Sequence, residues 1–163
     1  ESQQSSRWKL TVCSLRIAAN DPLSHHKTCS RLIQVFAASE ARERSADESL
    51  LLNTSGEVTE GSTSNVFWIE HGAVCTPPLT VGALPGVTRA VVFELCDALG
   101  VPRKEQTIRP EELCSCEGVF LCFTSRGVVE AASIDGKALR YSEITGRLRE
   151  AFEALLEREC PCS

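Results

Sequence analysis

Residues 46–79 read ADESLLLNTSGEVTEGSTSNVFWIEHGAVCTPPL, and this stretch decides the fold class. The leucines at 50–52 form a short apolar run, as in a buried strand, and the turn-forming residues 53–56 follow them. Two more apolar runs, 66–69 and 73–76, flank the sequence Glu70-His71-Gly72. Because a tight turn between two such runs is typical of a β-hairpin, we predict antiparallel strands here.

Similar patterns extend along the rest of the chain. Apolar runs predict further strands at 10–17, 119–124 and 128–134, and a short one at 104–108. The spacing of apolar residues predicts helices at 30–44, 87–99 and 142–159, with a single helical turn at 110–114. The strands come in hairpin-like groups without regular alternation with helices. This order favours one mixed α+β domain over residues 1–163 rather than a doubly wound parallel sheet.

Composition excludes several classes of protein. The net charge of −5 and a pI near 5.3 argue against a nucleic-acid-binding face, which needs a surplus of basic residues. No apolar run approaches the length that crosses a bilayer. The opening residues ESQQSSRWKL lack the charged-then-apolar pattern of a signal peptide. We therefore expect a cytoplasmic protein with no nucleic-acid or membrane partner.

The nine cysteines do not have the spacing of a metal site. An odd number cannot all pair within one chain, and no two CxxC motifs occur together. Several of them, including Cys13 and Cys122, lie in apolar runs, where a free thiol behaves as a small apolar residue. We interpret most of them as reduced packing residues and expect no bound metal.

Glu60 is the first candidate functional residue. It lies among small hydroxylated residues just before the apolar run 66–69, although Glu is not a preferred turn residue. One interpretation is a solvated turn that happens to contain an acid, and the other is a carboxylate that takes part in chemistry. The stretch alone leaves both open.

Three other segments contain candidate residues. Lys27 follows His25-His26 at a loop-to-helix junction, where a lysine partly withdrawn from water could offer a free amine for Schiff-base chemistry. In LPGVTR (84–89), Val87 and Thr88 begin a helix whose unpaired amides attract phosphate. In CFTSRGV (122–128), Thr124 and Ser125 end a strand with hydroxyls that suit an anion. Each segment also has an ordinary structural explanation.

Together these residues form the set that a pyridoxal phosphate site requires. An amine binds the cofactor aldehyde, a carboxylate keeps the pyridine nitrogen protonated, and hydroxyls with helix-start amides hold the phosphate. This chemistry requires the set but does not dictate the order of its members along the chain.

The order resembles that of the class IV aminotransferases, the fold-type IV pyridoxal phosphate enzymes. Branched-chain aminotransferases, D-amino acid aminotransferases and 4-amino-4-deoxychorismate lyase belong to this family. The resemblance covers about residues 10–137, through HHKTCSRL (25–32), the stretch 46–79, GALPGVTR (82–89) and EGVFLCFTSRGVVEAASIDG (117–136). It implies the family's larger C-terminal domain, a largely antiparallel sheet curled into a pseudo-barrel with helices.

The resemblance also implies roles for individual residues. By position, Lys27 matches the Schiff-base lysine and Glu60 the acid that pairs with the pyridine nitrogen. Val87 and Thr88 match the helix-start residues that bind the cofactor phosphate. Thr124, with Ser125 beside it, matches the hydroxyl residue that contacts the phosphate from the other side. Asn65 matches a residue that supports the turn. The family works on small amino acids and 2-oxo acids, and a homodimer is expected by the same resemblance.

Three functions stay open. An aminotransferase that moves an amino group between an amino acid and a 2-oxo acid is favoured as the commoner outcome in the family. Arg31-Leu32 and the motif TSRGV resemble the lyase, which eliminates pyruvate from aminodeoxychorismate to give 4-aminobenzoate. The third is a cofactor-binding or interaction domain without turnover.

Two departures from the family pattern bear on this choice. The family's smaller N-terminal domain has no counterpart in the sequence, so we expect either a fragment of a longer protein or a natural protein that lacks that half. In addition, Glu130-Ala131 stands where the family frequently has Pro-Val, so the wall on the substrate side should differ.

Overall fold

The computed structural model describes residues 7–19 and 21–159. Within them, nine strands form one sheet in the order β3-β2-β1-β8-β7-β4-β5-β6, with β9 paired to β8. The pairs β1–β2, β1–β8 and β5–β6 are parallel, and the other pairs are antiparallel. The strands are β1 (Trp8–Ile17), β2 (Glu48–Asn53), β3 (Val58–Gly61), β4 (Asn65–Glu70), β5 (Ala73–Thr76), β6 (Arg103–Glu105), β7 (Gly118–Phe123), β8 (Gly127–Ile134) and β9 (Lys137–Ala138).

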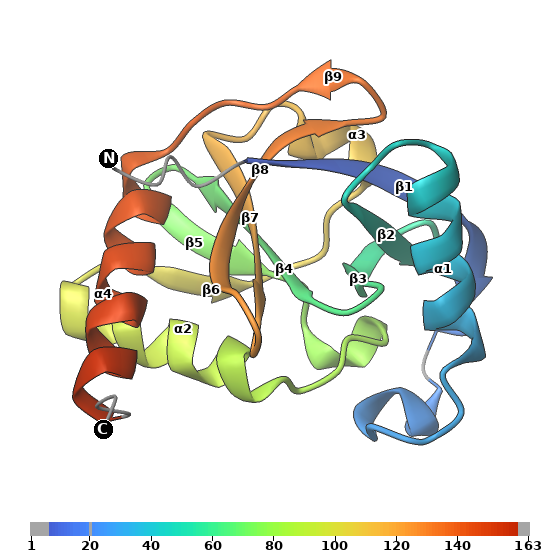
Figure 1. The fold of residues 1–163 in the computed structure, drawn as a ribbon, viewed down its shortest axis with the longest axis horizontal. Coiled ribbons are helices and arrows are strands. Elements are labelled where there is room, and N and C mark those ends of the chain that lie inside the picture. The colour runs from blue at the N-terminus through green and yellow to red at the C-terminus, as the bar shows by residue number, and fades with distance from the viewer. Residues whose placement is uncertain (1–6, 20, 160–163) are drawn as a thin grey trace.

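Helices cover the sheet at two places. They are α1 (Leu32–Glu43), α2 (Val87–Leu99), α3 (Pro110–Leu113) and α4 (Glu143–Glu159), with 3-10 turns η1 (Pro22–His25) and η2 (Leu79–Val81). Figure 1 shows α2 and α4 side by side on one part of the curled sheet, while α1 packs on β1 and β2. The predicted α+β class, with a mixed and largely antiparallel sheet, is confirmed.

The main apolar core lies inside the curl of the sheet. Leu50 of β2 and Val58 of β3 belong to the same buried cluster as Trp68 of β4 and Cys75 of β5. Because strands near opposite ends of the strand order share one core, the sheet bends into a half-barrel. A second cluster lies under α2 and α4 and is built from Phe67, Ile69, Val74, Val92, Cys96, Val101, Phe120, Cys122, Val128, Leu148 and Phe152.

Two sequence-based predictions of local structure are corrected. The small hydroxylated residues around Glu60 indicate a turn, yet Val58–Gly61 form β3, so Glu60 lies on a strand. Pairing with β2 outweighs the turn-like composition of this segment. The strand predicted at 104–108 is only Arg103–Glu105, because its partner β5 ends at Thr76, which pairs with Glu105.

A β-bulge on β3 sets the direction of the Glu60 side chain. Val58 pairs with Leu52 and Glu60 pairs with the adjacent residue Leu51, so Thr59 is an extra residue in the strand. Regular alternation would place Glu60 on the same face as Val58, inside the half-barrel. The extra residue instead turns Glu60 to the face of Leu51, in the way that bulges near sites redirect side chains. The Thr59 hydroxyl donates to the Leu51 carbonyl over 3.0 Å.

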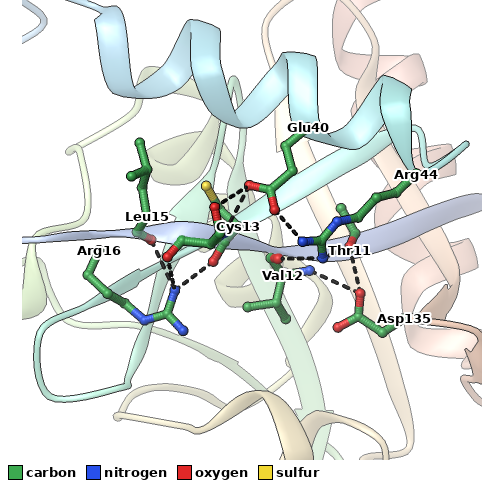
Figure 2. A network of polar contacts seen from close by, with 9 residues as sticks. Thr11, Val12, Cys13, Leu15, Arg16, Glu40, Arg44 and Asp135 are labelled. Carbon is green, nitrogen blue, oxygen red and sulfur yellow. Dashed lines mark hydrogen bonds and ion pairs between the residues drawn. The ribbon is translucent and has the colours of Figure 1, made fainter.

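The carboxylate of Glu40 connects α1 to β1 (Figure 2). It is 7% exposed and accepts hydrogen bonds from the amide and hydroxyl of Ser14, at 2.9 and 3.1 Å, while its other oxygen pairs with Arg44. Arg44 also donates to the hydroxyl of Thr11, which in turn donates to Asp135 beyond β8. This network holds α1 against the sheet.

Among the described residues, no helix combines the length and apolarity needed to cross a membrane. The seven cysteines in this part of the chain are free thiols, and Cys160 and Cys162 lie outside it. Burial raises the pKa of Cys75 and of Cys96 to about 11, so both stay neutral and pack as apolar groups, as predicted. The described His, Cys, Asp and Glu side chains form no group of three that could hold a metal ion.

Candidate functional site

A cavity of about 320 Å³ opens where four segments of the chain meet. The segments are the loop before α1, the turn between β3 and β4, the start of α2, and the end of β7. The lining residues are Lys27, Arg31, Glu60, Gly61, Ser62, Thr63, Ser64, Asn65, Leu84, Pro85, Gly86, Val87, Thr88, Cys122, Phe123 and Thr124.

This one cavity brings together five of the six residues that the sequence singled out as cofactor ligands. They are Lys27, Glu60, Val87, Thr88 and Thr124. The sixth, Ser125, is exposed in the turn after β7 and is not among the residues that line the cavity. Asn65, expected to support the turn, also lines it.

Glu60 is a buried acid at the cavity wall. It is 9% exposed, and its Oε2 accepts a hydrogen bond of 2.9 Å from the amide of Leu84. Burial raises the pKa of Glu60 to about 7, and the charge of Glu48 adds to this, whereas the Leu84 amide and Arg31 act in the opposite direction. Near neutral pH the carboxyl group is therefore poised to hold or release a proton.

The start of α2 forms a second wall, rich in hydrogen-bond donors. Gly86 is the N-cap residue and no side chain caps the helix, so the first amides have no partner within it. The hydroxyl oxygen of Thr88 lies 3.4 Å from that of Thr124, which comes from the end of β7. Unpaired amides, a helix dipole and two hydroxyls together favour an anion at this point.

Asn65 joins the turn before β4 to the loop before α2. Its side-chain amide donates to the carbonyl of Leu84 over 2.9 Å. Position 86 must be glycine for this approach, because a Cβ atom there would lie 2.1 Å from Oδ1 of Asn65. Leu84 is thus bonded at its amide to Glu60 and at its carbonyl to Asn65.

Lys27 and Arg31 reach the cavity from the loop before α1. The side chain of Lys27 is exposed at the mouth, rather than partly buried as the sequence suggested, and Arg31 is half-buried. Arg31 opposes the effect of burial on the pKa of Glu60. A lysine amine, a buried acid and an anion-binding helix start thus surround one space.

Sequence reasoning did not assign several lining residues. The stretch that contains Glu60 also contains Ser62, Thr63 and Ser64. The sequence does not tell which of their hydroxyls face the cavity. Cys122 was interpreted as a packing residue, and burial raises the pKa of its thiol to about 12, so it contributes a neutral surface. Only the spatial arrangement shows that these groups belong to the wall.

The model of the class IV amino-transferase family matches residues 1–134. The chain belongs to this family. It is 33% identical over 131 residues to the branched-chain-amino-acid aminotransferase of Escherichia coli K12, covering 78% of this chain and 42% of that protein. The chain thus spans less than half the length of the curated relatives it matches.

Solved structures of class IV aminotransferases and a lyase have the same fold. The branched-chain amino acid aminotransferase from Thermobaculum terrenum, in its PLP form, superposes with a TM-score of 0.87 at 28% identity over 94% of this chain and 52% of its own. A putative 4-amino-4-deoxychorismate lyase from Legionella pneumophila gives a TM-score of 0.87 at 26% identity, over 94% of this chain and 58% of its own.

Proposed function

We propose that this chain is the cofactor-binding part of a pyridoxal phosphate enzyme that transfers an amino group between an amino acid and a 2-oxo acid. One observation carries the proposal. Lys27, Glu60 and the start of α2 all line a single cavity, although they come from distant parts of the sequence. Membership of the class IV aminotransferase family supports the same function.

The residues present fit the chemical groups of pyridoxal phosphate. The amides at the start of α2, with Thr88 and Thr124, offer donors for a phosphate. Glu60 offers a buried acid for the pyridine nitrogen, and Lys27 offers the amine for the aldehyde. When bound, the cofactor accepts the electron pair released at the α-carbon of the substrate.

Each of these residues then has a distinct task. Lys27 would hold the cofactor through its Nζ atom and would carry the proton to and from the α-carbon of the substrate. Glu60 holds the proton of the ring nitrogen through a charge-assisted hydrogen bond. Val87 and Thr88 fix the phosphate through helix-start amides and a hydroxyl. Ser125, which lies off the cavity wall, is a weaker candidate for this task.

The lyase reaction is the second candidate, favoured by Arg31. This residue lines the cavity, and Arg31-Leu32 is the pair that resembles the lyase. A guanidinium at the wall suits a substrate with carboxylates, as aminodeoxychorismate has. In that reaction the same lysine moves the protons that accompany the elimination of pyruvate.

We further propose that the working enzyme is a cytoplasmic homodimer. Four large apolar side chains of α1 face solvent, and the three most exposed are Leu32 at 78%, Val35 at 64% and Phe36 at 46%. Their spacing places them on one side of the helix, as expected of a surface that another chain covers. Free thiols throughout the described residues accord with a reducing compartment.

Absorbance spectroscopy and two product assays test the proposal. The chain is titrated with pyridoxal 5'-phosphate and the visible band of the lysine-bound cofactor is followed. Activity is then measured as amino transfer that depends on a 2-oxo acid, and as release of pyruvate with 4-aminobenzoate. Amino transfer supports the first candidate and pyruvate release the second. A chain that gives no band contradicts both.

A further inference from the structure

Glu48 is a buried carboxylate that faces the turn between β3 and β4. It begins β2 and is 2% exposed. Its Oε1 accepts hydrogen bonds from the amides of Ser49 and Ser62, at 2.9 and 3.0 Å, and from the Ser62 hydroxyl. Its Oε2 accepts from the amide and hydroxyl of Thr63, at 3.2 and 2.9 Å, and from the Ser64 hydroxyl at 3.1 Å.

These donors include every residue of the turn 62–64. Each of the three residues gives Glu48 a hydroxyl, and two of them give a backbone amide as well. Hydrogen bonds to an ionised acceptor are roughly twice as strong as neutral ones. One side chain therefore contacts every residue of the turn, in addition to the backbone bonds from Gly61 to Ser64 and from Ser62 to Ser49.

The turn fits closely around the carboxylate. Gly61 precedes it and donates to the carbonyl of Ser64 over 2.7 Å. A Cβ atom on Gly61 would lie 2.2 Å from the Ser64 hydroxyl and 3.1 Å from the carboxyl carbon of Glu48. The Glu48 carboxylate and the Ser64 hydroxyl thus already fill the space beside the turn.

The residues that flank this turn form hydrogen bonds with the backbone of Leu84. Glu60, just before it, accepts from the Leu84 amide, and Asn65, just after it, donates to the Leu84 carbonyl, both over 2.9 Å. Leu84 leads through Pro85 and Gly86 into α2. The conformation of the turn therefore fixes where the acid and the start of α2 lie relative to each other.

We infer that Glu48 is a positioning residue of the cofactor site, whose carboxylate holds the turn 62–64 so that the acid and the anion-binding helix start keep their spacing. The inference rests on the proposed function for its consequence. Glu48 lies outside the cavity wall, so it acts on the site through its hydrogen bonds and through the charge that helps raise the pKa of Glu60. A cofactor that spans both groups needs that spacing in advance of binding.

Glu48→Gln is the sharpest variant. It keeps the size of the side chain but puts an NH₂ group opposite amides and hydroxyls that donate, so hydrogen bonds on one oxygen are lost. Glu40→Gln is the matched control. Glu40 is also buried and also accepts from a serine amide and hydroxyl, but it connects α1 to β1 and lies off the cavity.

The experiment uses the full chain and two readouts besides thermal melting. Hydrogen exchange of the cofactor-free chain should be about tenfold faster at 61–65 and 84–88 in Glu48→Gln and unchanged there in Glu40→Gln. The dissociation constant for pyridoxal 5'-phosphate should rise tenfold or more only in Glu48→Gln, since supporting partners of a binding site typically account for about 10–100-fold. Both variants should melt at lower temperature.

The readouts separate failure of this inference from failure of the proposed function. Unchanged exchange at 61–65 and 84–88 in Glu48→Gln overturns the inference, as does an equal loss of affinity in both variants. If the unsubstituted chain does not bind pyridoxal phosphate, the proposed function fails, while the exchange data still decide the role of Glu48. Should Glu48→Gln not fold, Ser62→Ala removes a single donor and must show the same faster exchange to a smaller degree.

Discussion

The hydroxyl oxygens of Thr88 and Thr124 lie 3.4 Å apart, although one begins α2 and the other follows β7. A helix start and a strand end thus converge on one point, where neither alone would make an anion site. This contact and the others around the cavity lead to specific expectations for single substitutions.

Replacing Thr88 with valine should weaken the binding of pyridoxal 5'-phosphate tenfold or more. The substitution keeps the shape of the side chain and removes the hydroxyl, and a hydrogen bond to a charged group contributes about 1.5–3 kcal/mol. Ser125→Ala is the matched control because Ser125 does not line the cavity. Fluorescence titration of both variants tests this. Equal losses in both would show that the phosphate lies nearer to the turn after β7.

Removing the amine of Lys27 should abolish the visible band of the lysine-bound cofactor. Lys27→Ala leaves no primary amine at the cavity, while the phosphate-binding groups remain, so weaker non-covalent binding should persist. Lys104→Ala removes an exposed lysine on β6, outside the cavity, and should keep the band. Persistence of the band in Lys27→Ala would assign the covalent role to another lysine.

The buried acid should make the stability of the cofactor-free chain depend on pH. The pKa of Glu60 is raised from its ordinary 4.5 to about 7, so the folded chain binds a proton that the unfolded chain releases in this range. Stability therefore falls as pH rises from about 4.5 to about 7, by up to roughly 3 kcal/mol. Glu60→Gln should flatten this dependence. Denaturant unfolding at several pH values measures it, and identical slopes in both chains would contradict the prediction.

Adding one methyl group at position 86 should disturb the site from the side of α2. In Gly86→Ala the new Cβ would lie 2.1 Å from Oδ1 of Asn65, so the bond from Asn65 to Leu84 must shift or break. Overpacking of this kind costs about 1–3 kcal/mol. Gly146→Ala in α4 is the control. Its new Cβ would lie 3.2 Å from the Tyr141 hydroxyl, and alanine has a higher helix propensity than glycine. Chemical denaturation should separate the two variants clearly.

A charge on the exposed face of α1 should prevent association of two chains. Phe36 is 46% exposed and stands beside Leu32 and Val35 on that face. In Phe36→Asp, burial of the face against a second chain would desolvate a carboxylate without a partner. Light scattering after size exclusion should give a dimer for the unsubstituted chain and a monomer for the variant. A monomer in both cases would remove the support for a homodimer.

Much of this site follows from residue types and their order. Three local patterns each indicate a candidate functional residue: a lysine at a helix entry, a proline–glycine pair before a helix, and hydroxyls after a buried strand. The family resemblance assigns all three to one site. The composition around Glu60 predicts a turn, but pairing with β2 makes that segment a strand. Such pairing depends on contacts across the sheet, which local composition does not encode.

The supporting residues could not be predicted in the same way. Glu48 looks like an ordinary polar residue before a run of leucines. Its hydrogen-bond partners in the turn, Ser62, Thr63 and Ser64, lie 14 to 16 positions further along the sequence. Its importance depends on the register between β2 and β3. Arg31 likewise acquires a place in the cavity wall only because the fold brings the loop before α1 beside the turn between β3 and β4.

The additional residue at Thr59 lets β3 lose one residue without turning the acid of this site. Deleting one codon there would leave Val58 opposite Leu52 and Glu60 opposite Leu51 in regular pairing, so the carboxylate would keep its face and only the hydroxyl bond from Thr59 to Leu51 would be lost. Among natural variants of this chain, in-frame loss of this one residue should therefore leave the direction of the carboxylate unaltered.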